Sequence, residues 1–300
     1  VGGLVGEHSV LSRAYKNIDG YSSKVMMPMR NCYNRGDVSG QTAGGITGNI
    51  LYPAVINDSE YDPTAFYENL YSTGTVTAGS GGAGGIVGSF AVEDDGEEVS
   101  FQFTGCFALG QMVKGAGLDT TDALVGAVDA TSRLFLSFPE KDYYWQGMEL
   151  TGGGETKSAG QGNALSTALF NSFMANDAYW PDGNWTLQTG KLPILTNTPG
   201  RQDGAYPMHL ALSGTPAEAD NRIGVGIHSA QELCYAAEHY PANNPYYTFY
   251  LENDVDMAGV TDFTPFQTFA GRFNGGGHAI QNLVIDRPNE SKLGLFAYVD

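Results

Sequence analysis

Gly2-Gly3-Leu4-Val5-Gly6 is the first copy of a five-residue block that recurs through the first half of the chain. The block returns as GGITG at residues 44–48, as GGIVG at residues 84–88 and, in weaker form, as DALVG at residues 122–126. Successive copies lie 42, 40 and 38 residues apart. A period of about 40 residues is typical of repeat architectures, in which each copy packs against the next.

A second block precedes three of these copies: NCYNRGDV at 31–38, NLYSTGTV at 69–76 and GCFALGQM at 105–112. A fourth copy, DYYWQG at 142–147, keeps the aromatic residues and the glycine. The alignment predicts four columns: Cys32, Leu70, Cys106, Tyr143; then Tyr33, Tyr71, Phe107, Tyr144; then Gly36, Gly74, Gly110, Gly147; then Val38, Val76, Met112. We expect the residues of one column to lie side by side in neighbouring repeats.

The glycine column predicts a backbone bend, or a left-handed conformation, that a Cβ would obstruct. The short β-branched and aromatic runs between the glycines indicate strands, and the period holds no helical stripe. Strands that repeat every 40 residues without helices leave a β-solenoid or a propeller. A propeller blade would bring four strands and a Gly-His…Trp-Asp signature, which the sequence lacks, so the stacked columns favour the solenoid.

The two blocks resemble the GLUG repeats of bacterial cell-surface proteins, which include adhesins and the non-catalytic regions of immunoglobulin A peptidases. The resemblance covers residues 1–150 as about four repeats. It extends to FAGRFNGGGHAI at residues 269–280, a segment similar to one that often opens such a domain, and to LGLFA at 293–297, where Ala297 replaces the usual glycine. The resemblance implies an all-β fold, a right-handed parallel β-helix, and no single activity.

We predict two modules with short capping helices. Residues 1–150 form the C-terminal part of one β-helix, residues 151–198 its closing helix and terminal strand, residues 199–222 a linker, and residues 223–300 the N-terminal cap and first coils of a second β-helix. Helical spacing of apolar residues predicts a helix over 164–176. Ser229 and Glu232 form a capping box for a second helix that ends before Pro241, and residues 247–251 alternate as a strand.

The composition limits the possible partners. The chain of 300 residues has 41 glycines, 42% hydrophobic residues and a net charge of −18. Such a charge argues against binding nucleic-acid phosphates or an anionic membrane surface, and no apolar run is long enough to span a bilayer. We expect a β-rich extracellular or cell-surface protein. The start has neither a basic nor an apolar leader region, which indicates an interior piece whose targeting signals lie elsewhere.

Carboxylates are the first candidates for chemistry, because parallel β-helices also carry polysaccharide lyases and hydrolases. Asp254 and Asp256 share one strand face and could form an acid/base pair or part of a calcium site, but we favour a structural role at the end of a strand. Asp94, Asp95, Glu97 and Glu98 are interpreted as a solvated acidic loop, with weak calcium binding as the alternative. His278, followed by Ala279, is interpreted as a turn or strand histidine.

For the remaining candidate residues, the cysteines and tryptophans, we favour packing roles. Three cysteines exclude a disulfide scaffold, and Cys32, Cys106 and Cys234 are predicted to be free thiols. Cys32 and Cys106 should lie two repeats apart and point inward with Leu70 between them. Trp145, Trp180 and Trp185 could stack on sugars, yet core packing is the preferred interpretation. The sequence holds no His-Glu-x-x-His zinc motif, no Gly-x-Ser-x-Gly elbow and no P-loop.

We therefore predict a non-catalytic structural or interaction segment of a secreted or surface-displayed adhesin-like protein. Its partner would be a host glycoprotein, a glycan or a neighbouring surface protein. No catalytic, cofactor-binding or metal-binding residue and no cofactor is predicted. The alternative is a carbohydrate-active β-helix enzyme, which would require two or three carboxylates clustered on consecutive coils.

Overall fold

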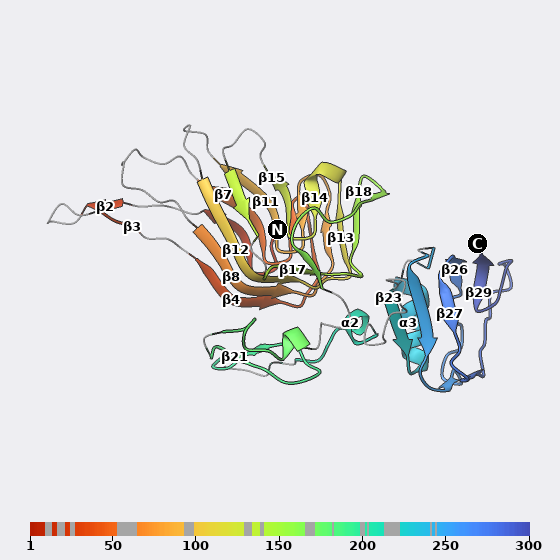
Figure 1. The fold of residues 1–300 in the computed structure, drawn as a ribbon. Coiled ribbons are helices and arrows are strands. Elements are labelled where there is room, and N and C mark those ends of the chain that lie inside the picture. Colours follow the sequence, from red (N-terminus) through yellow and green to blue (C-terminus); the bar gives the residue numbers. More distant parts are fainter. Residues whose placement is uncertain are drawn as a thin grey trace. The chain divides into compact units, whose positions relative to one another are not determined.

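The computed structural model describes residues 1–9, 14–16, 22–24, 28–52, 65–92, 99–128, 134–138, 141–165, 172–181, 183–198, 202, 204–212, 223–240, 242–243 and 245–300. The chain divides into two compact units: an N-terminal unit of Val1–Ser166 and Ser172–Gly204, and a C-terminal unit of Thr167–Asn171 and Ala205–Asp300. Strands dominate and helices are few (Figure 1), which confirms the prediction of an all-β chain.

In the N-terminal unit, each repeat contributes one strand to each of four sheets. The first repeat holds β4 (Met29–Asn34), β5 (Val38–Gly40), β6 (Ala43–Gly44) and β7 (Thr47–Tyr52). The second holds β8 (Ala65–Ser72), β9 (Val76–Ala78), β10 (Ala83–Gly84) and β11 (Val87–Val92). The third holds β12 (Val99–Ala108), β13 (Met112–Gly115), the 3₁₀ turn η1 (Leu118–Thr120), β14 (Thr121–Asp122) and β15 (Val125–Val128).

The chain before and after these repeats completes the sheets. Added are β1 (Val5–Ser9), β16 (Leu134–Ser137), β17 (Tyr143–Trp145), β18 (Glu149–Gly152), β19 (Glu155–Thr156) and β20 (Asn163–Leu165), with β2 (Ala14–Lys16) and β3 (Ser22–Lys24) as a separate pair. The sheet orders are β4-β8-β12-β17-β20, β5-β9-β13-β18-β19, β6-β10-β14 and β1-β7-β11-β15, with β16 beside β12. The pairs between the three repeats are parallel.

In the strand register, each repeat adds one strand to each sheet, so equivalent residues of successive repeats lie in neighbouring strands. Gly44 pairs with Gly2 and with Gly84, which pairs with Asp122, as the first block predicts. Leu70 lies between Cys32 and Cys106 in the neighbouring strands. Two strand spacings separate the cysteines by about 10 Å, beyond the reach of a disulfide. Leu70 and Cys106 are fully buried and Cys32 packs against the same core, so this column faces inward as expected.

Three residues of the predicted alignment are wrong by one position. Tyr143 pairs with Phe107 and Tyr144 with Ala108, because the connection from β17 to β18 is one residue longer than the connection from β12 to β13. Matching Gly147 to Gly110 therefore shifted the strand before it by one residue. In the last column Val113, not Met112, pairs with Val76.

The glycine column is needed for close packing and not for a left-handed conformation. Gly36, Gly74 and Gly110 have ordinary φ angles, but a Cβ on Gly74 would lie 2.0 Å from the carbonyl oxygen of Gly36. The left-handed bend occurs earlier in each repeat, at Asn31 (φ 53°), Asn69 (φ 54°) and Gly105 (φ 69°). Asparagine and glycine are the residues that tolerate this conformation best, so the sequence carried the signal in a different column.

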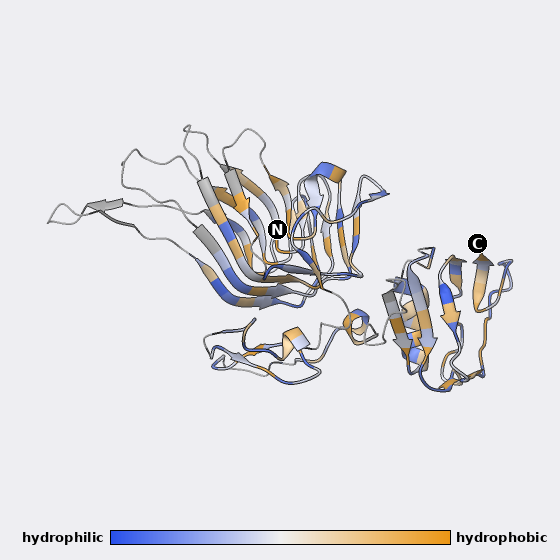
Figure 2. Ribbon diagram, viewed as in Figure 1, coloured by the Kyte–Doolittle hydropathy of each residue, from blue (hydrophilic) through white to orange (hydrophobic). Residues whose placement is uncertain are grey.

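Buried and exposed side chains alternate along the short strands, which shows which face of each sheet lines the core. In β9, Val76 and Ala78 are buried while Thr77 is partly exposed, and in β13 Val113 is buried while Lys114 is exposed. Figure 2 shows this alternation of apolar and polar residues along the stacked strands. One cluster of buried residues is the column Val38, Val76, Val113 and Leu150 with Ala43, Ala78, Ala83 and Ala123.

Residues 172–204 form a strap that belongs to the N-terminal unit and holds the antiparallel pair β21 (Trp185–Thr186) and β22 (Ile194–Leu195). It packs against the outer side of β4, β8 and β12, where Tyr33, Tyr71, Phe107 and Tyr143 form an aromatic column. The Tyr71 hydroxyl donates to the carbonyl oxygen of Pro193 at 2.7 Å. The helix expected over 164–176 is confirmed only at residues 172–174, because residues 163–165 are strand and 166–171 lie outside the described residues.

Residues 157–161 close the hydrogen bonding of the third repeat. In the earlier repeats the amide of Thr47 donates to Ile86 and that of Val87 to Leu124. At the equivalent place the Val125 amide donates to the side-chain oxygen of Gln161 at 2.8 Å. The Asp122 carboxylate accepts from the Gly160 amide at 3.1 Å and pairs with Lys157 at 3.3 Å. Side chains thus replace the next strand at this edge, which a bare strand would otherwise expose.

The C-terminal unit repeats the parallel pattern on a shorter period. Parallel pairing joins β24 (Tyr247–Leu251) to both β23 (Ile223–Ile227) and β27 (Arg272–Asn274). Likewise, β25 (Val255–Asp256) pairs with β28 (Ile280–Gln281), and β26 (Phe266–Phe269) pairs with β29 (Phe296–Val299). The strand predicted at 247–251 is confirmed.

The helix α3 (Ala230–His239) begins at the predicted N-cap, because the Ser229 side chain accepts from the Glu232 amide. The Glu232 carboxylate reaches back, as the capping box predicts, and accepts from the amide of His228, one residue before the N-cap, at 2.7 Å. The predicted linker 199–222 differs in part, since Met208–Leu212 form the helix α2, with Leu210 buried and the His209 carbonyl bonded by the Tyr240 hydroxyl.

Candidate functional site

Asp254 and Asp256 connect two successive passes of the chain in the C-terminal unit. The Asp254 carboxylate accepts from the Ala279 amide at 3.0 Å, and the Asp256 carboxylate accepts from the Asn282 side chain at 2.7 Å and the Ala258 amide at 3.0 Å. These hydrogen bonds, the Asn282 bond first, lower the pKa of Asp256. Both carboxylates therefore have the structural role that the sequence favours.

His278 lies in the turn between β27 and β28, where its amide donates to the Gly275 carbonyl at 2.7 Å. Its Nδ1 is 3.4 Å from the Asp254 carboxylate. This placement confirms the turn interpretation. Within the described part of the chain no three His, Cys, Asp or Glu side chains gather as a metal site, and the acidic loop with Asp94, Asp95, Glu97 and Glu98 lies outside that part.

All three tryptophans are buried, so none forms an exposed platform for sugars. Trp145 is fully buried, and Trp180 stacks on Phe107 with ring centroids 4.8 Å apart. Trp185 donates its indole N–H to the Asn31 side chain at 3.1 Å. The core-packing interpretation is confirmed, and two of the three belong to the strap.

Asp142 is a buried carboxylate that the sequence analysis did not single out. Its side chain is inaccessible to solvent; one oxygen accepts from the Cys106 amide at 2.9 Å, and the other has no partner among the described residues. Burial raises the pKa of Asp142 to about 7, against the lowering effect of the Cys106 amide. Asp142 does not line the strap cavity described below.

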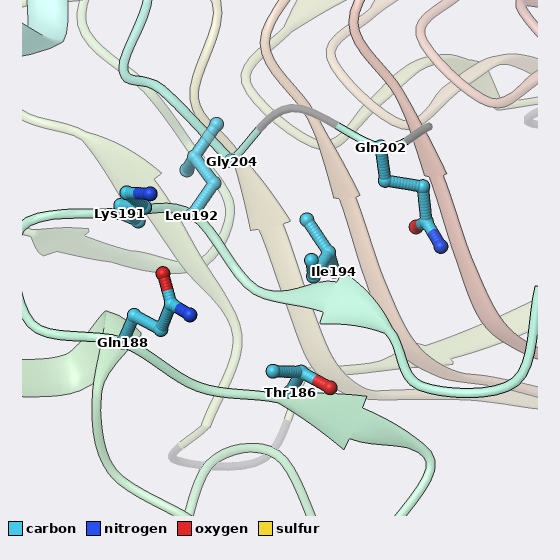
Figure 3. A pocket seen from close by; sticks show the side chains of 7 residues that line it. All are labelled: Thr186, Gln188, Lys191, Leu192, Ile194, Gln202 and Gly204. Carbon is cyan, nitrogen blue, oxygen red and sulfur yellow. The ribbon is translucent and has the colours of Figure 1, made fainter. Parts of the chain in front are cut away.

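The strap contains a cavity of about 260 Å³ beside β21 and β22. Figure 3 shows its lining side chains: Thr186 and Gln188 from β21 and the turn that follows, Lys191 and Leu192 from the end of that turn, Ile194 from β22, and Gln202 with Gly204 from the next segment. Gly190 has φ 74° in this turn, a conformation that favours glycine. The turn is closed by a hydrogen bond from the Lys191 amide to the Gln188 carbonyl.

The second candidate surface is the outer side of β5, β9, β13 and β18, which we name the hydroxyl face. Ser39, Thr77, Lys114 and Thr151 lie in one register row across these strands. Ser39 and Lys114 are exposed, and Thr77 and Thr151 are partly exposed. Neighbouring strands are spaced by about 4.8 Å, so the row offers evenly spaced hydroxyl groups and one amine.

No protein-family model, curated protein or solved structure matches the chain. None of the helices among the described residues has the length and apolar character needed to cross a membrane. The strap cavity could not be predicted, because its lining residues belong to no repeat. The hydroxyl face could be predicted in part, since Ser39 and Thr77 directly follow copies of the second block.

Proposed function

We propose that the chain is a non-catalytic interaction segment of a secreted or surface-displayed, adhesin-like bacterial protein. Its repeats would form right-handed parallel β-helices of the GLUG type, and its partner would be a host glycoprotein, a glycan or a neighbouring surface protein. The hydroxyl face is the observation that carries this proposal. A row of exposed and partly exposed polar groups at regular spacing suits contact with an extended, hydroxyl-rich partner better than the enclosure of a small substrate.

The use of the carboxylates supports a non-catalytic role. Asp122, Asp142, Asp254 and Asp256 each accept at least one hydrogen bond from a backbone amide. A carboxylate committed to backbone amides holds strands together and is poorly placed to transfer protons to a substrate. Retaining and inverting glycosidases need two free carboxyl groups facing one bond.

Binding of the whole 300-residue chain to an immobilised mucin-type glycoprotein, measured by biolayer interferometry, tests the proposal. We expect binding that falls at least fivefold when Thr77 and Thr151 are both replaced by Arg, since bulky charged side chains would disrupt contact along the row. Replacing Glu290, an exposed residue of the C-terminal unit, by Arg is the matched control and should leave binding unchanged. New reducing ends or unsaturated products from polysaccharides would instead support the enzyme alternative.

A further inference from the structure

Two polar side chains that line the strap cavity are not engaged elsewhere. Among the described residues, neither the Gln188 amide nor the Lys191 ammonium has a side-chain hydrogen-bond or ion-pair partner, and both residues are exposed. Lys191 is the one ionisable side chain among the described residues that line the cavity. A cation with no carboxylate among the described lining residues is notable in a chain with a net charge of −18.

The opposite wall of the cavity is held in place. The Gln202 amide donates to the Leu195 carbonyl at 2.7 Å, and its oxygen accepts from the Leu195 amide at 2.9 Å and from the Tyr33 hydroxyl at 2.7 Å. The Thr186 hydroxyl lies 3.1 Å from that of Thr196. Because these groups are already bonded, the cavity is preformed, and a ligand would not have to order this wall.

We propose that this cavity binds a carboxylate-bearing sugar. The Lys191 ammonium pairs with the carboxylate, the Gln188 amide bonds ring hydroxyls, and Leu192 with Ile194 contact the C–H face of the ring. The volume of about 260 Å³ equals roughly nine waters at about 30 Å³ each, which is enough for one sugar ring. This inference rests on the proposed role in binding extracellular glycans, and it adds a site distinct from the hydroxyl face.

Other small ligands fit the lining less well. A divalent cation would need several oxygen ligands and at least one carboxylate, and Lys191 would repel it. A neutral sugar would leave the ammonium without a partner and gain only the weaker amide bonds. Charge-assisted hydrogen bonds are about twice as strong as neutral ones, so the carboxylate should determine selectivity.

Titration of the intact chain with D-glucuronate, D-glucose and inorganic phosphate, followed by calorimetry or ligand-observed NMR, tests the site. We expect glucuronate to bind at least tenfold more tightly than glucose, and Lys191→Met to remove that difference. Gln188→Ala should weaken glucuronate binding several-fold. Lys292→Met, which removes one exposed positive charge in the C-terminal unit, is the matched control and should leave binding unchanged.

Equal binding of glucuronate and glucose, full retention of selectivity in Lys191→Met, or tighter binding of phosphate than of glucuronate would each overturn the inference. The methyl glycoside of glucuronate separates the two sources of this chemistry. Binding of the glycoside supports a sugar at the end of a glycan, and binding of the free acid alone supports a soluble sugar acid at the same site. Mucin binding that depends on Thr77 and Thr151 without any effect of Lys191→Met would retain the proposed function while the cavity proposal fails.

Discussion

Two outer sheet faces of the stacked repeats in the N-terminal unit differ, because one is covered by the strap and the other is exposed to solvent. On one, the column Tyr33, Tyr71, Phe107 and Tyr143 is covered by the strap, and on the other the row Ser39, Thr77, Lys114 and Thr151 stays exposed. Both follow the same parallel register, so the backbone does not cause the difference. The difference lies in the outward-facing side chain that each repeat contributes. Aromatic residues at this position create a face that another segment covers, and polar residues leave the face exposed.

The covered face gains its stability from aromatic contacts across large sequence separations. Tyr33 and Tyr71 stack with centroids 4.8 Å apart, and Trp180 packs on both Phe107 and Tyr71. Aromatic pairs of this kind add about 0.5–1.5 kcal/mol beyond the burial of their apolar area. The hydroxyl face has no comparable contribution, which is the basis for the predictions that follow.

The largest effect is expected for Trp180→Ala on the covered face. The side chain is 2% exposed, and its loss leaves a cavity between the strap and the aromatic column. Truncation of a buried tryptophan costs about 3–5 kcal/mol of unfolding free energy. Urea denaturation monitored by circular dichroism measures this change. A loss below about 1 kcal/mol would show that the strap does not cover the column.

A smaller effect, dependent on pH, is expected from Asp142, which directly precedes β17 in the covered sheet. Its pKa of about 7 in the folded chain lies above the ordinary value of 3.8, so folding favours the protonated form. The contribution of Asp142 to the unfolding free energy is therefore greatest below pH 4. It falls as the pH rises from about 4 to about 7 and is constant above that. The fall is at most about 4 kcal/mol, at 1.36 kcal/mol per pKa unit.

Asp142→Asn should remove this pH dependence, because the amide oxygen can still accept from the Cys106 amide while no charge forms. The titratable group that faces Asp142 is the Cys106 thiol, whose own pKa is raised by its burial. Unfolding free energies of both variants at pH 4.5, 6 and 8 measure the effect as a difference, which cancels the other carboxylates. If the unfolding free energies of the unmodified chain and of Asp142→Asn differed by the same amount at all three pH values, the predicted pH dependence would be wrong.

Tyr71→Phe should cost about 1–3 kcal/mol. The substitution keeps the stacked ring but leaves the Pro193 carbonyl without its buried donor. Thermal denaturation gives the change. Tyr33→Phe, whose hydroxyl donates to Gln202 at a partly exposed place, should cost less. A reversal of this order would mean that the strap is held mainly at Gln202.

The smallest effect is expected on the hydroxyl face. Thr77→Val should change the unfolding free energy by no more than about 0.5 kcal/mol, because it alters a partly exposed side chain outside the core. Chemical denaturation in parallel with Trp180→Ala provides the comparison. A cost above 1 kcal/mol would indicate that this face is packed against another part of the protein and is not a free surface.

Repetition made the sheet register predictable from the sequence. The glycine block placed Gly44 beside Gly84, and the second block placed Leu70 between the cysteines, because a parallel stack puts equivalent residues of successive repeats side by side. The alignment failed where a connection gains one residue, as before Val113 and after Tyr143. Such a shift is invisible when the alignment is anchored on a glycine.

The strap and its cavity could not be predicted, since they depend on contacts that no repeat encodes. Tyr71 and Pro193 are 122 residues apart, and Tyr33 and Gln202 are 169 apart. Core packing was predicted for Trp180 and Trp185, but the sequence did not indicate which face they would cover. The burial of Asp142 could not be predicted for a related reason. A single carboxylate beside two tyrosines is also typical of a solvated strand end, and only the tertiary contacts distinguish the two.

The side-chain closure at residues 157–161 restricts how the number of repeats can change during evolution or engineering. A repeat duplicated between two existing ones finds a strand on each side, and the terminal bonds of Asp122 and Gln161 are undisturbed. A repeat appended after Val128 would compete with Gln161 for the Val125 amide and would separate Asp122 from Lys157. Longer arrays should therefore arise by internal duplication, with the closing segment inherited unchanged.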